Sequence, residues 1–320
     1  MSKILVTGAT GFVGREVCRD LHQRGHTITG TTRNKDLAVG PENIPLYHVP
    51  EFNNDMDWSP AVAGVDVVVH LAARVHQIND RSPDPLSEYR RVNLDGTKSL
   101  ALAASAAGVR RLIFLSSIKV NGELTHGEPF SEDDHPDPVD AYGISKWEAE
   151  QAIRDIAAKN SIESVILRSP LVYGPYVSGN FAVLARAVIK NRPLPLGAIA
   201  NSRSLVYVGN LASAISICID HPNAQGETFL VSDGDDLSTG ELVRRMAKAA
   251  RIKDRLFYCP LWVLHAAGMI AGRRQVIDRI TESLEINSDK ILRVLSWSPS
   301  YSVDEGLRVT MRFFNMIFRR

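Results

Sequence analysis

The chain of 320 residues has 44% apolar and 23% charged residues, the composition of an ordinary globular protein with a sizeable core. Its formal net charge of +1 gives no electrostatic reason to expect a nucleic-acid partner. Cys18, Cys218 and Cys259 lie far apart without metal-ligand spacing, so we expect reduced thiols, a cytoplasmic protein and no bound metal.

A strand and a glycine-rich turn open the sequence. Residues 3–7 are apolar on both faces, as in a covered parallel strand, and no secretory signal precedes them. Gly8 allows a tight turn, Gly11 lets a phosphate approach the backbone, and Gly14 lets the next helix pack on the sheet. That helix would direct its N-terminal amides at a pyrophosphate, although a turn without a ligand is the alternative. The predicted dinucleotide contacts are Gly8, Thr10, Gly11, Phe12, Val13 and Gly14.

The residues after the second strand, 27–31, bear on the choice of cofactor. An NAD site usually carries an acidic residue here to hold the two ribose hydroxyls, whereas an arginine can accommodate the 2′-phosphate of NADP. This sequence has Thr32, Arg33 and Asn34 instead. Arg33 therefore favours NADP over NAD, and a solvated arginine at a strand end is an equally good interpretation.

Two further strands, 45–49 and 66–73, are predicted beside the first two. Glu51 and Phe52 follow the first of these, where they would contact the adenine edge. The second ends in mostly small side chains, which let a flat cofactor lie close to the backbone. Its predicted cofactor contacts are Leu71, Ala72 and Ala73.

A long helix is predicted over 86–107, and it contains Asn93. Before it, His70 and His76 lack partners at metal-ligand spacing, so structural roles are favoured for both. The stretch 122–140 is rich in Gly, Pro, Asp and His, and we interpret it as a loop on the substrate side.

Tyr142 and Lys146 open a predicted long helix directly after that loop. Residues four apart lie on one face of a helix, one turn apart. The Lys146 ammonium would lower the pKa of the Tyr142 hydroxyl, which could then exchange a proton with a sugar hydroxyl or ketone. The spacing alone also fits two surface neighbours, and the glycine-rich turn upstream favours the chemical interpretation.

Strands and helices alternate up to about residue 170, with the fifth and sixth strands at 111–116 and 164–169. Beyond them the pattern is mixed, with a short strand over 227–231 and helices near 180–190, 210–220, 239–250 and 261–271. This order predicts an α/β fold, a doubly wound parallel (Rossmann) sheet with a smaller carboxyl-terminal α/β lobe. We expect a dinucleotide-binding domain at 1–175 and a mainly substrate-binding lobe at 176–320, some segments of which return to the sheet.

The most apolar later stretch, 256–272, is too short for a membrane span and is interrupted by Pro260 and His265. A buried or interface helix is the better interpretation. We expect no span elsewhere in the chain.

The sequence resembles the extended short-chain dehydrogenases/reductases of the UDP-sugar 4-epimerase, 4-ketoreductase and dehydratase group, in the NAD-dependent epimerase/dehydratase family. TGATGFVG, HLAA, VNLDGT, LSS, YGISK and VYGP occur in the family's order over nearly the whole chain. The resemblance implies that Ser117 hydrogen-bonds the reacting hydroxyl, Tyr142 transfers the proton and Lys146 holds the nicotinamide ribose. It also implies that Asn93 and Ser169 line the cofactor site.

The carboxyl-terminal half carries a similar resemblance for the substrate. Asn180 and Phe181 resemble the segment whose asparagine and following amides hold a nucleotide pyrophosphate, and Leu196 resembles the rim of the uridine pocket. Arg203 resembles the family's diphosphate-contacting arginine, a role that suits a guanidinium because it donates two parallel hydrogen bonds. A structural arginine at a strand end is the alternative. A further arginine between 273 and 279 is a candidate for the phosphates.

One departure from the family reduces the number of reactions that we expect of this chain. The Asp-Glu pair that the 4,6-dehydratases use after the catalytic hydroxyl is replaced by Ile118 and Lys119, so we do not expect dehydration. Lys119 resembles a bacterial subgroup of UDP-sugar enzymes linked to N-acetyl-6-deoxyhexosamine synthesis.

The favoured function is NAD(P)-dependent reduction of a UDP-4-keto-6-deoxy-N-acetylhexosamine, for the synthesis of surface-polysaccharide sugars. The alternative is a UDP-glucose or UDP-N-acetylglucosamine 4-epimerase with tightly bound NAD. A non-catalytic dinucleotide sensor on the same fold is the remote alternative, since fold alone does not establish function. A homodimer is the expected assembly.

Overall fold

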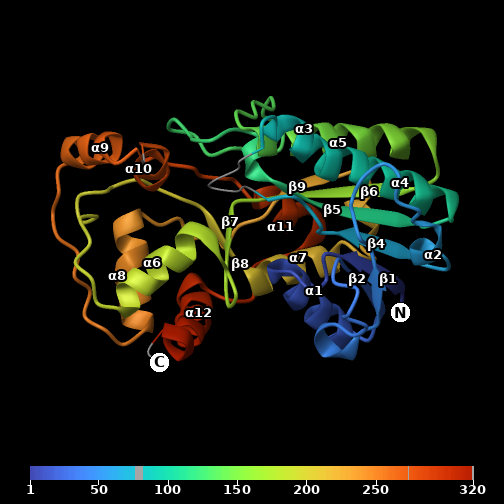
Figure 1. Cartoon of the computed structure of the whole chain (residues 1–320), viewed down its shortest axis with the longest axis horizontal. Helices are drawn as coiled ribbons and strands as arrows, with labels where there is room; N and C mark the ends of the chain where they lie inside the picture. The colour runs from blue at the N-terminus through green and yellow to red at the C-terminus, as the bar shows by residue number, and fades with distance from the viewer. Residues whose placement is uncertain (76–81, 273, 319–320) are drawn as a thin grey trace.

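A parallel sheet forms the centre of the structure, a computed structural model that describes residues 1–75, 82–272 and 274–318. Its strand order is β3-β2-β1-β4-β5-β6-β9, and every neighbouring pair is parallel (Figure 1). The predicted α/β class with a doubly wound sheet is confirmed. The strands are β1 (Lys3–Thr7), β2 (Thr27–Thr32), β3 (Leu46–His48), β4 (Val67–His70), β5 (Arg111–Ser117), β6 (Glu163–Ser169) and β9 (Thr228–Leu230).

The fourth strand is shorter than expected. β4 ends at His70, so the residues from Leu71 to Ala73 lie in the loop that follows. The Thr7 hydroxyl accepts hydrogen bonds from the amides of Leu71 and Ala72, at 3.1 Å each. These amides therefore turn away from the ladder of the sheet.

Alternating side chains of the strands face two helical layers. In β1, Ile4 and Val6 pack with α1, α7 and α11, whereas Leu5 packs with α2, α4 and α5 on the other face. Because both faces are covered, the strands are apolar on both sides. These helices are α1 (Phe12–Gln23), α2 (Ser59–Val62), α4 (Gly96–Ala106), α5 (Ala141–Lys159), α7 (Val208–Ile217) and α11 (Asp289–Leu295).

The helical segment predicted over 86–107 contains a π turn. α3 (Pro85–Tyr89) leads into the π-helical segment η2 (Arg90–Asp95), which leads into α4 without a break. A π turn inserts one residue into a helix and is common at functional sites. Here it carries Asn93, whose buried side chain bonds to Ser145 of α5.

A second, smaller core lies beside the sheet (Figure 1, left). At its centre β7 (Leu171–Tyr173) and β8 (Leu205–Tyr207) form a two-stranded parallel sheet, which the sequence analysis did not predict. Around and beyond it lie α6 (Gly179–Ile189), α8 (Thr239–Ala249), α9 (Leu261–Ile270), α10 (Arg274–Thr281) and α12 (Val303–Phe318). Short 3₁₀ segments lie at Pro41–Asn43 (η1), Ile118–Val120 (η3) and Pro222–Ala224 (η4).

β9 and α11, from the carboxyl-terminal half, lie with the main sheet rather than with this smaller core. The division of the chain at residue 175 stays a prediction. Across the described ranges, no helix is both long and apolar enough to cross a membrane.

Gly14 is the point where α1 approaches the turn after β1 most closely. A Cβ atom at this position would lie 2.1 Å from the Gly8 carbonyl oxygen and 2.8 Å from Ala9 Cα. Both are backbone atoms, so the contact could be relieved only by moving α1.

We expect Gly14→Ala to lower the free energy of unfolding by about 1–3 kcal/mol, the usual cost of forcing a methyl group into a packed site. Dinucleotide affinity should also fall, because α1 would be displaced. Gly240→Ala is the control, since a Cβ there would lie 3.2 Å from the Leu196 carbonyl oxygen and α8 gains from alanine. Chemical denaturation and cofactor titration measure both effects, and equal stability of the two variants would contradict the prediction.

Candidate active site

β1 and β4 lie side by side at the centre of the sheet and stay paired up to their last residues, Thr7 and His70. The chain leaves these neighbouring strands in opposite directions, an arrangement that opens a crevice for a ligand. The glycine turn lies here, with Gly8 at φ 70° and the Gly11 amide donating to the Gly8 carbonyl at 2.9 Å. No side chain caps the N-terminus of α1, so its first amides remain available to a phosphate.

These features fit a nicotinamide dinucleotide. A Cβ at Gly8 would lie 3.1 Å from the Ala72 backbone, and one at Gly11 would lie 3.1 Å from the Gly8 carbonyl oxygen. Glycine thus keeps the backbone open to a pyrophosphate. Thr10 lies in this turn, and Phe12 and Val13 follow in the first turn of α1. Within the described parts of the chain, no three His, Cys, Asp or Glu side chains are placed to hold a metal.

A buried polar chain braces the turn. The Thr7 hydroxyl, which accepts from two amides after β4, lies 2.7 Å from Nδ1 of His70, and Nε2 of His70 lies 2.8 Å from the Thr97 hydroxyl. Because the amides occupy the lone pairs of the Thr7 oxygen, its proton goes to Nδ1 and Nε2–H donates to Thr97. Burial lowers the pKa of His70 to about 3, and the charge of Lys146 adds to this effect. His70 is a neutral structural residue, and His76 lies outside the described residues.

The residues predicted for the adenosine end have different surroundings. Arg33 follows β2, is exposed and shows no hydrogen bond or ion pair with the described residues. Glu51 is exposed and pairs with Arg91 at 3.3 Å. The Phe52 ring is buried against Trp58, with 4.9 Å between ring centroids, and the adenine contact stays a prediction. Any adenine contact at Phe52 has to come from its backbone.

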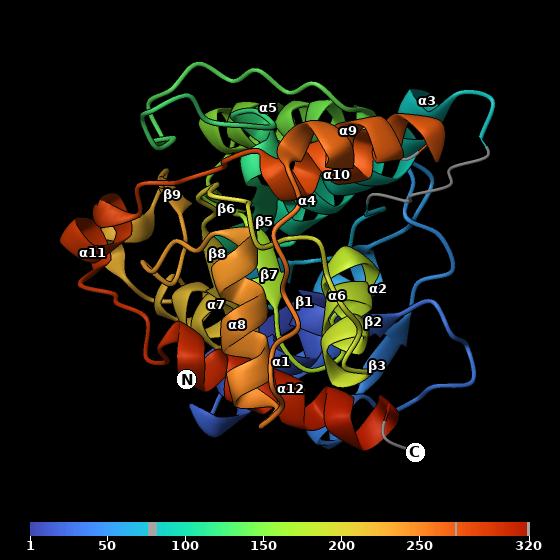
Figure 2. The same ribbon diagram turned by 90° about the vertical axis from the view of Figure 1, so that its left-hand side faces the viewer.

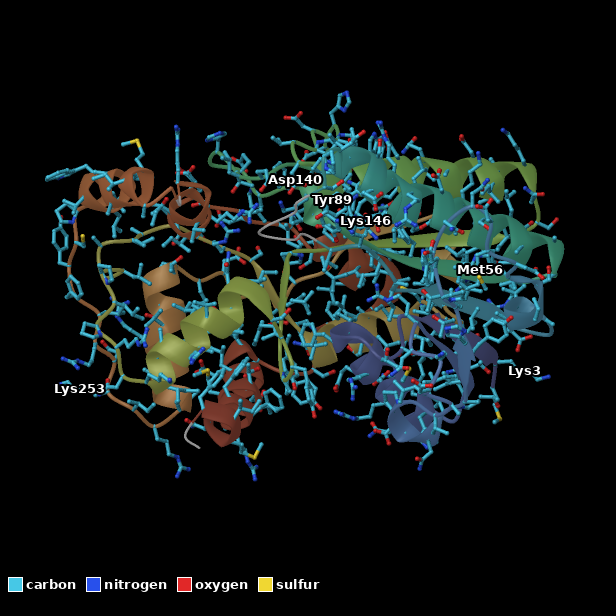
Figure 3. All side chains as sticks on the ribbon, viewed as in Figure 1. Lys3, Met56, Tyr89, Asp140, Lys146 and Lys253 are labelled. Atoms are coloured by element: carbon cyan, nitrogen blue, oxygen red, sulfur yellow. The ribbon has the colours of Figure 1, made fainter. Side chains whose placement is uncertain are left out.

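The predicted proton-transfer pair meets where β5 ends and α5 begins. Ser117 is the last residue of β5, Tyr142 lies in the first turn of α5, and their side chains are close enough for Ser117 to influence the pKa of Tyr142. Asp140 caps α5 by accepting from an amide of its first turn at 2.7 Å, which fixes the start of the helix. Tyr89 packs edge-on against Tyr142, with 6.1 Å between ring centroids. Figure 3 shows Asp140, Tyr89 and Lys146 together where the sheet meets the smaller lobe.

Lys146 lies one turn after Tyr142 and is buried, with 2% of its surface exposed. Its Nζ donates to the Leu115 carbonyl at 2.6 Å and lies 3.9 Å from the centre of the Phe114 ring. Burial lowers the pKa of Lys146 to about 7, and the charge of Glu150 opposes this shift. The ammonium is therefore close to losing its proton at neutral pH.

The pKa of Tyr142 differs from the sequence-based expectation. Burial raises it to about 12, the interaction with the nearby Ser117 side chain lowers it, and the charge of Asp140 raises it. The expected lowering of the Tyr142 pKa by Lys146 is wrong for the chain without cofactor. Burial destabilises the Lys146 ammonium, and its Nζ donates to the Leu115 carbonyl. Tyr142 therefore keeps its proton at neutral pH.

A buried carboxylate one turn further along α5 was missed from the sequence. Glu150 is fully buried and accepts from Arg168 Nη2 at 2.7 Å and from the Ser116 hydroxyl at 2.6 Å. These contacts hold α5 against β5 and β6. The signal in the sequence was the spacing of four residues from Lys146, which puts both side chains on one helix face.

Asn93 and Ser169, both predicted to line the cofactor site, occupy different positions. The Asn93 side chain donates to the Arg74 carbonyl and to Ser145 Oγ, at 3.0 Å each, and accepts from the Arg74 amide at 2.8 Å. It thereby ties the loop after β4 to α5. Ser169 ends β6 directly beside Ser117 in the register of the sheet.

Lys119 forms ion pairs beside the predicted catalytic tyrosine. Its Nζ donates to Glu123 at 2.6 Å and to Asp140, the residue that caps α5. Lys119 thus pairs with two carboxylates and joins the segment after β5 to the start of α5.

Arg203 links the smaller lobe to this region. Its backbone pairs with Leu237 and Leu284, and its Nη1 donates to the Glu282 carbonyl at 2.9 Å. Burial lowers the pKa of Arg203, the charge of Glu123 raises it and that of Arg279 lowers it. The structure therefore brings Arg279 of α10 near Arg203, whereas Arg273 lies outside the described residues.

The remaining predicted substrate residues surround the start of α6 and the loop after it. Asn180 is exposed in the first turn of α6, whose N-terminus has no side-chain cap. Phe181 is buried and stacks on Tyr173, with 5.6 Å between ring centroids, so its amide rather than its ring is available to a ligand. Leu196 is buried in the core of the smaller lobe.

The glycine turn, the neighbouring Ser117 and Tyr142 side chains and Lys146 on a doubly wound sheet are the features of an extended short-chain dehydrogenase/reductase. A sequence model of the NAD dependent epimerase/dehydratase family matches residues 4–232. The chain belongs to this family and is an enzyme of it.

Individual relatives extend the match to nearly the full length. The chain is 42% identical over 313 residues to a UDP-glucose 4-epimerase of Vibrio cholerae, a match that covers 97% of this chain and 95% of the relative. It is 29% identical over 272 residues to the N-acetyl-alpha-D-glucosaminyl-diphospho-ditrans,octacis-undecaprenol 4-epimerase of Escherichia coli O157:H7, with 84% and 77% of the two chains covered. Its fold is similar to that of a Thermus thermophilus UDP-glucose 4-epimerase solved with NAD, with a TM-score of 0.79, 26% identity, and 98% and 99% of the two chains covered.

We expect Tyr142→Phe to lower turnover by about two to four orders of magnitude, the usual contribution of a general acid or base. The ring and its packing on Tyr89 are kept, so cofactor affinity should change little. Steady-state kinetics and cofactor titration test the two parts. Near-normal turnover on the true substrate would show that another group transfers the proton.

Lys146 also predicts a pH dependence of stability. Its pKa is about 7 in the folded chain and about 10.4 when unfolded, so between these values the unfolded state binds more protons. The free energy of unfolding should therefore rise with pH from 7 to 10, by up to about 1.4 kcal/mol per pH unit from this group. Denaturation of the cofactor-free protein should show a smaller rise in Lys146→Met. Identical pH profiles would contradict the buried, weakly basic state.

Proposed function

We propose that the chain is a UDP-sugar 4-epimerase that uses NAD. The observation that carries the proposal is the proximity of Ser117 and Tyr142, one helical turn from Lys146, on the edge of the sheet that holds the glycine turn. The epimerase names of the Vibrio cholerae relative and of the Thermus thermophilus structure with NAD support the reaction and the cofactor. They favour the epimerase over the reductase that the sequence alone favoured.

In this reaction Tyr142 would remove the proton of the sugar 4-hydroxyl and later return it to oxygen 4 of the epimer. This role requires that bound cofactor and substrate lower the pKa of Tyr142 from its value in the cofactor-free chain. Ser117 orients that hydroxyl by a hydrogen bond, and Lys146 holds the nicotinamide ribose. Nicotinamide bound there would supply hydride transfer from and back to carbon 4. Gly8, Gly11 and the first amides of α1 hold the pyrophosphate, with Asn93 and Ser169 on the nicotinamide side.

The smaller lobe holds the nucleotide half of the substrate. Arg203 and the neighbouring Arg279 supply positive charge for the diphosphate, and the uncapped start of α6 supplies amides at Asn180 and Phe181. Leu196 packs near the uridine. Anchoring the UDP in this way leaves the 4-keto sugar free to rotate and present its opposite face, which an epimerase requires.

Reduction of a UDP-4-keto-6-deoxy-N-acetylhexosamine with NADPH is the second candidate, and Arg33 is the observation that favours it. Arg33 follows β2 where an acid would hold the ribose hydroxyls of NAD, and its exposed guanidinium is available to a 2′-phosphate. A reductase consumes reduced cofactor in each cycle and gains from selecting NADPH.

The two candidates differ in their use of cofactor, and absorbance of the nicotinamide separates them. With UDP-glucose or UDP-N-acetylglucosamine, an epimerase forms the 4-epimer without net loss of NADH or NADPH. Stoichiometric loss of NADPH with the 4-keto sugar, and no interconversion of the UDP-hexoses, would overturn the epimerase proposal.

Arg33→Asp provides a further check on the cofactor. If Arg33 contacts a 2′-phosphate, the variant should shift the ratio of NADP to NAD affinity towards NAD. An unchanged ratio would show that the Arg33 side chain is solvated and does not contact a 2′-phosphate. Lys35→Asp, at an exposed position two residues further on, controls for the change in charge.

Arg203→Ala should weaken UDP binding by about 1.5–3 kcal/mol, the range for loss of a charge-assisted hydrogen bond. Dinucleotide affinity should stay the same, because Arg203 lies in the smaller lobe. Arg244→Ala is a control, since Arg244 is a surface arginine of α8 that pairs with Glu241 at 3.1 Å. Calorimetry that shows equal UDP affinity in Arg203→Ala and the parent would move Arg203 to a structural role.

The homodimer and the cytoplasmic location stay predictions from the sequence.

A further inference from the structure

Helix α9 is apolar on nearly all sides, yet one of its faces is exposed. His265 is its single polar side chain between Leu261 and Ile270. A helix of this kind is normally buried, which matches the buried or interface helix expected from the sequence. On its inner side, Leu264 is buried, and a Cβ at Gly268 would lie 2.5 Å from the Ile277 side chain of α10. The packing on α10 therefore accounts for one face and leaves the other uncovered.

The uncovered side carries large apolar side chains. Trp262 and Met269, seven residues apart and so on one face, are 74% and 60% exposed, and Ile270 is 89% exposed. The segment before the helix continues this surface, with Tyr258 at 75% exposed. We call this surface the tip patch, formed by Phe257, Tyr258, Leu261, Trp262, Met269 and Ile270. Figure 2 shows α9 and the segment leading to it across the outer end of the smaller lobe.

Basic side chains accompany the tip patch. Arg274 begins α10 directly after α9, with 76% of its side chain exposed, and it lies 3.7 Å from Asp278. Lys253 lies on the same outer end, far from Lys3 at the opposite end (Figure 3). The exposed basic residues of the adjoining segments are Lys190, Arg192, Arg251, Lys253, Arg255 and Arg274, and the acids among them are Asp254 and the half-buried Asp278. The end of the lobe therefore combines exposed aromatic rings with a net positive charge.

This combination identifies the kind of partner. Two copies of the chain meeting at this patch would be related by a two-fold axis, which brings two surfaces of net positive charge together. An anionic lipid surface instead attracts the basic residues, and Trp and Tyr are the side chains that settle at the boundary between headgroups and hydrocarbon. A short amphipathic segment with these groups lies in the interface and does not cross it.

We propose that the tip patch docks this enzyme on an anionic phospholipid surface. Trp262, Met269 and Ile270 enter the boundary between headgroups and hydrocarbon, and Lys253 and its basic neighbours contact lipid phosphates. α10, which carries Arg279, packs behind α9, so docking brings the smaller lobe to the lipid surface. The catalytic chemistry does not depend on this contact.

The experiment uses the full-length protein and sedimentation with vesicles of phosphatidylcholine that contain about one-third phosphatidylglycerol. The protein should sediment with these vesicles at low salt, and much less with vesicles of phosphatidylcholine alone. Trp262 gives a second readout, because Trp58 and Trp297 are buried and Trp147 is half-buried. Vesicle binding should shift tryptophan emission to the blue, and the shift should vanish in Trp262→Phe.

Two matched pairs of variants separate the apolar and the charged contributions. Met269→Ser should reduce vesicle binding several-fold, whereas Met316→Ser on α12 should not, although both methionines are 60% exposed. Lys253→Gln should weaken binding about fivefold, as expected for one basic residue near an anionic surface, and Lys3→Gln should leave it unchanged. The turnover of all four variants on a soluble UDP-sugar should match that of the parent, which shows that they are folded.

Two results would overturn the proposal. One is the absence of sedimentation and of the emission shift with the anionic vesicles. The other is a dimer that Met269→Ser dissociates, without vesicle binding by the parent, which would make the tip patch a surface between copies of the chain.

Discussion

The alignment of the active site depends on one buried carboxylate. Glu150 accepts hydrogen bonds from Arg168 at 2.7 and 3.0 Å, from Arg154 at 3.1 Å and from Ser116 at 2.6 Å, and no part of it is exposed. Its charge is tolerated only while these donors stay in place, since breaking a buried pair costs about 3–5 kcal/mol. α5 can therefore dock at one position along β5 and β6. Tyr142 and Lys146, on the same helix, are positioned by a contact that takes no part in their chemistry.

Local patterns predict the main sheet well because central strands such as β1, β4 and β5 are largely buried on both faces and rich in apolar residues. The first strand was expected and found over the same residues, Lys3–Thr7. The smaller sheet could not be predicted in this way. β7 and β8 have three residues each and pair Leu171 with Leu205, so their stability comes from tertiary packing. Tyr173 of β7 fills the space beside Gly306 of α12, where a Cβ would lie 2.6 Å from its hydroxyl oxygen.

In the candidate site, too, local sequence patterns predict some features, whereas others depend on tertiary packing. Helical spacing is a local property, so the sequence could place Tyr142 and Lys146 on one face of α5. The direction of a pKa shift depends on burial by the whole fold, and here burial opposes what the pair alone would do. Phe52 shows the same limit, because its ring is taken up by the core against Trp58. Likewise, the proximity of Arg203 and Arg279 follows from the packing of distant segments.

The π turn at Arg90–Asp95 has a consequence for insertions and deletions. A π turn holds one residue more than the α-helical turn it replaces, so the helices on either side of it keep their faces. Losing one residue from this segment would therefore restore a regular α-helix, and the buried face of α4, which includes Leu100 and Ala104, would still meet the sheet. The change would fall inside the segment itself, where Asn93 would lose the position from which it contacts Ser145. The extra residue therefore serves the Asn93 contact and not the packing of α4.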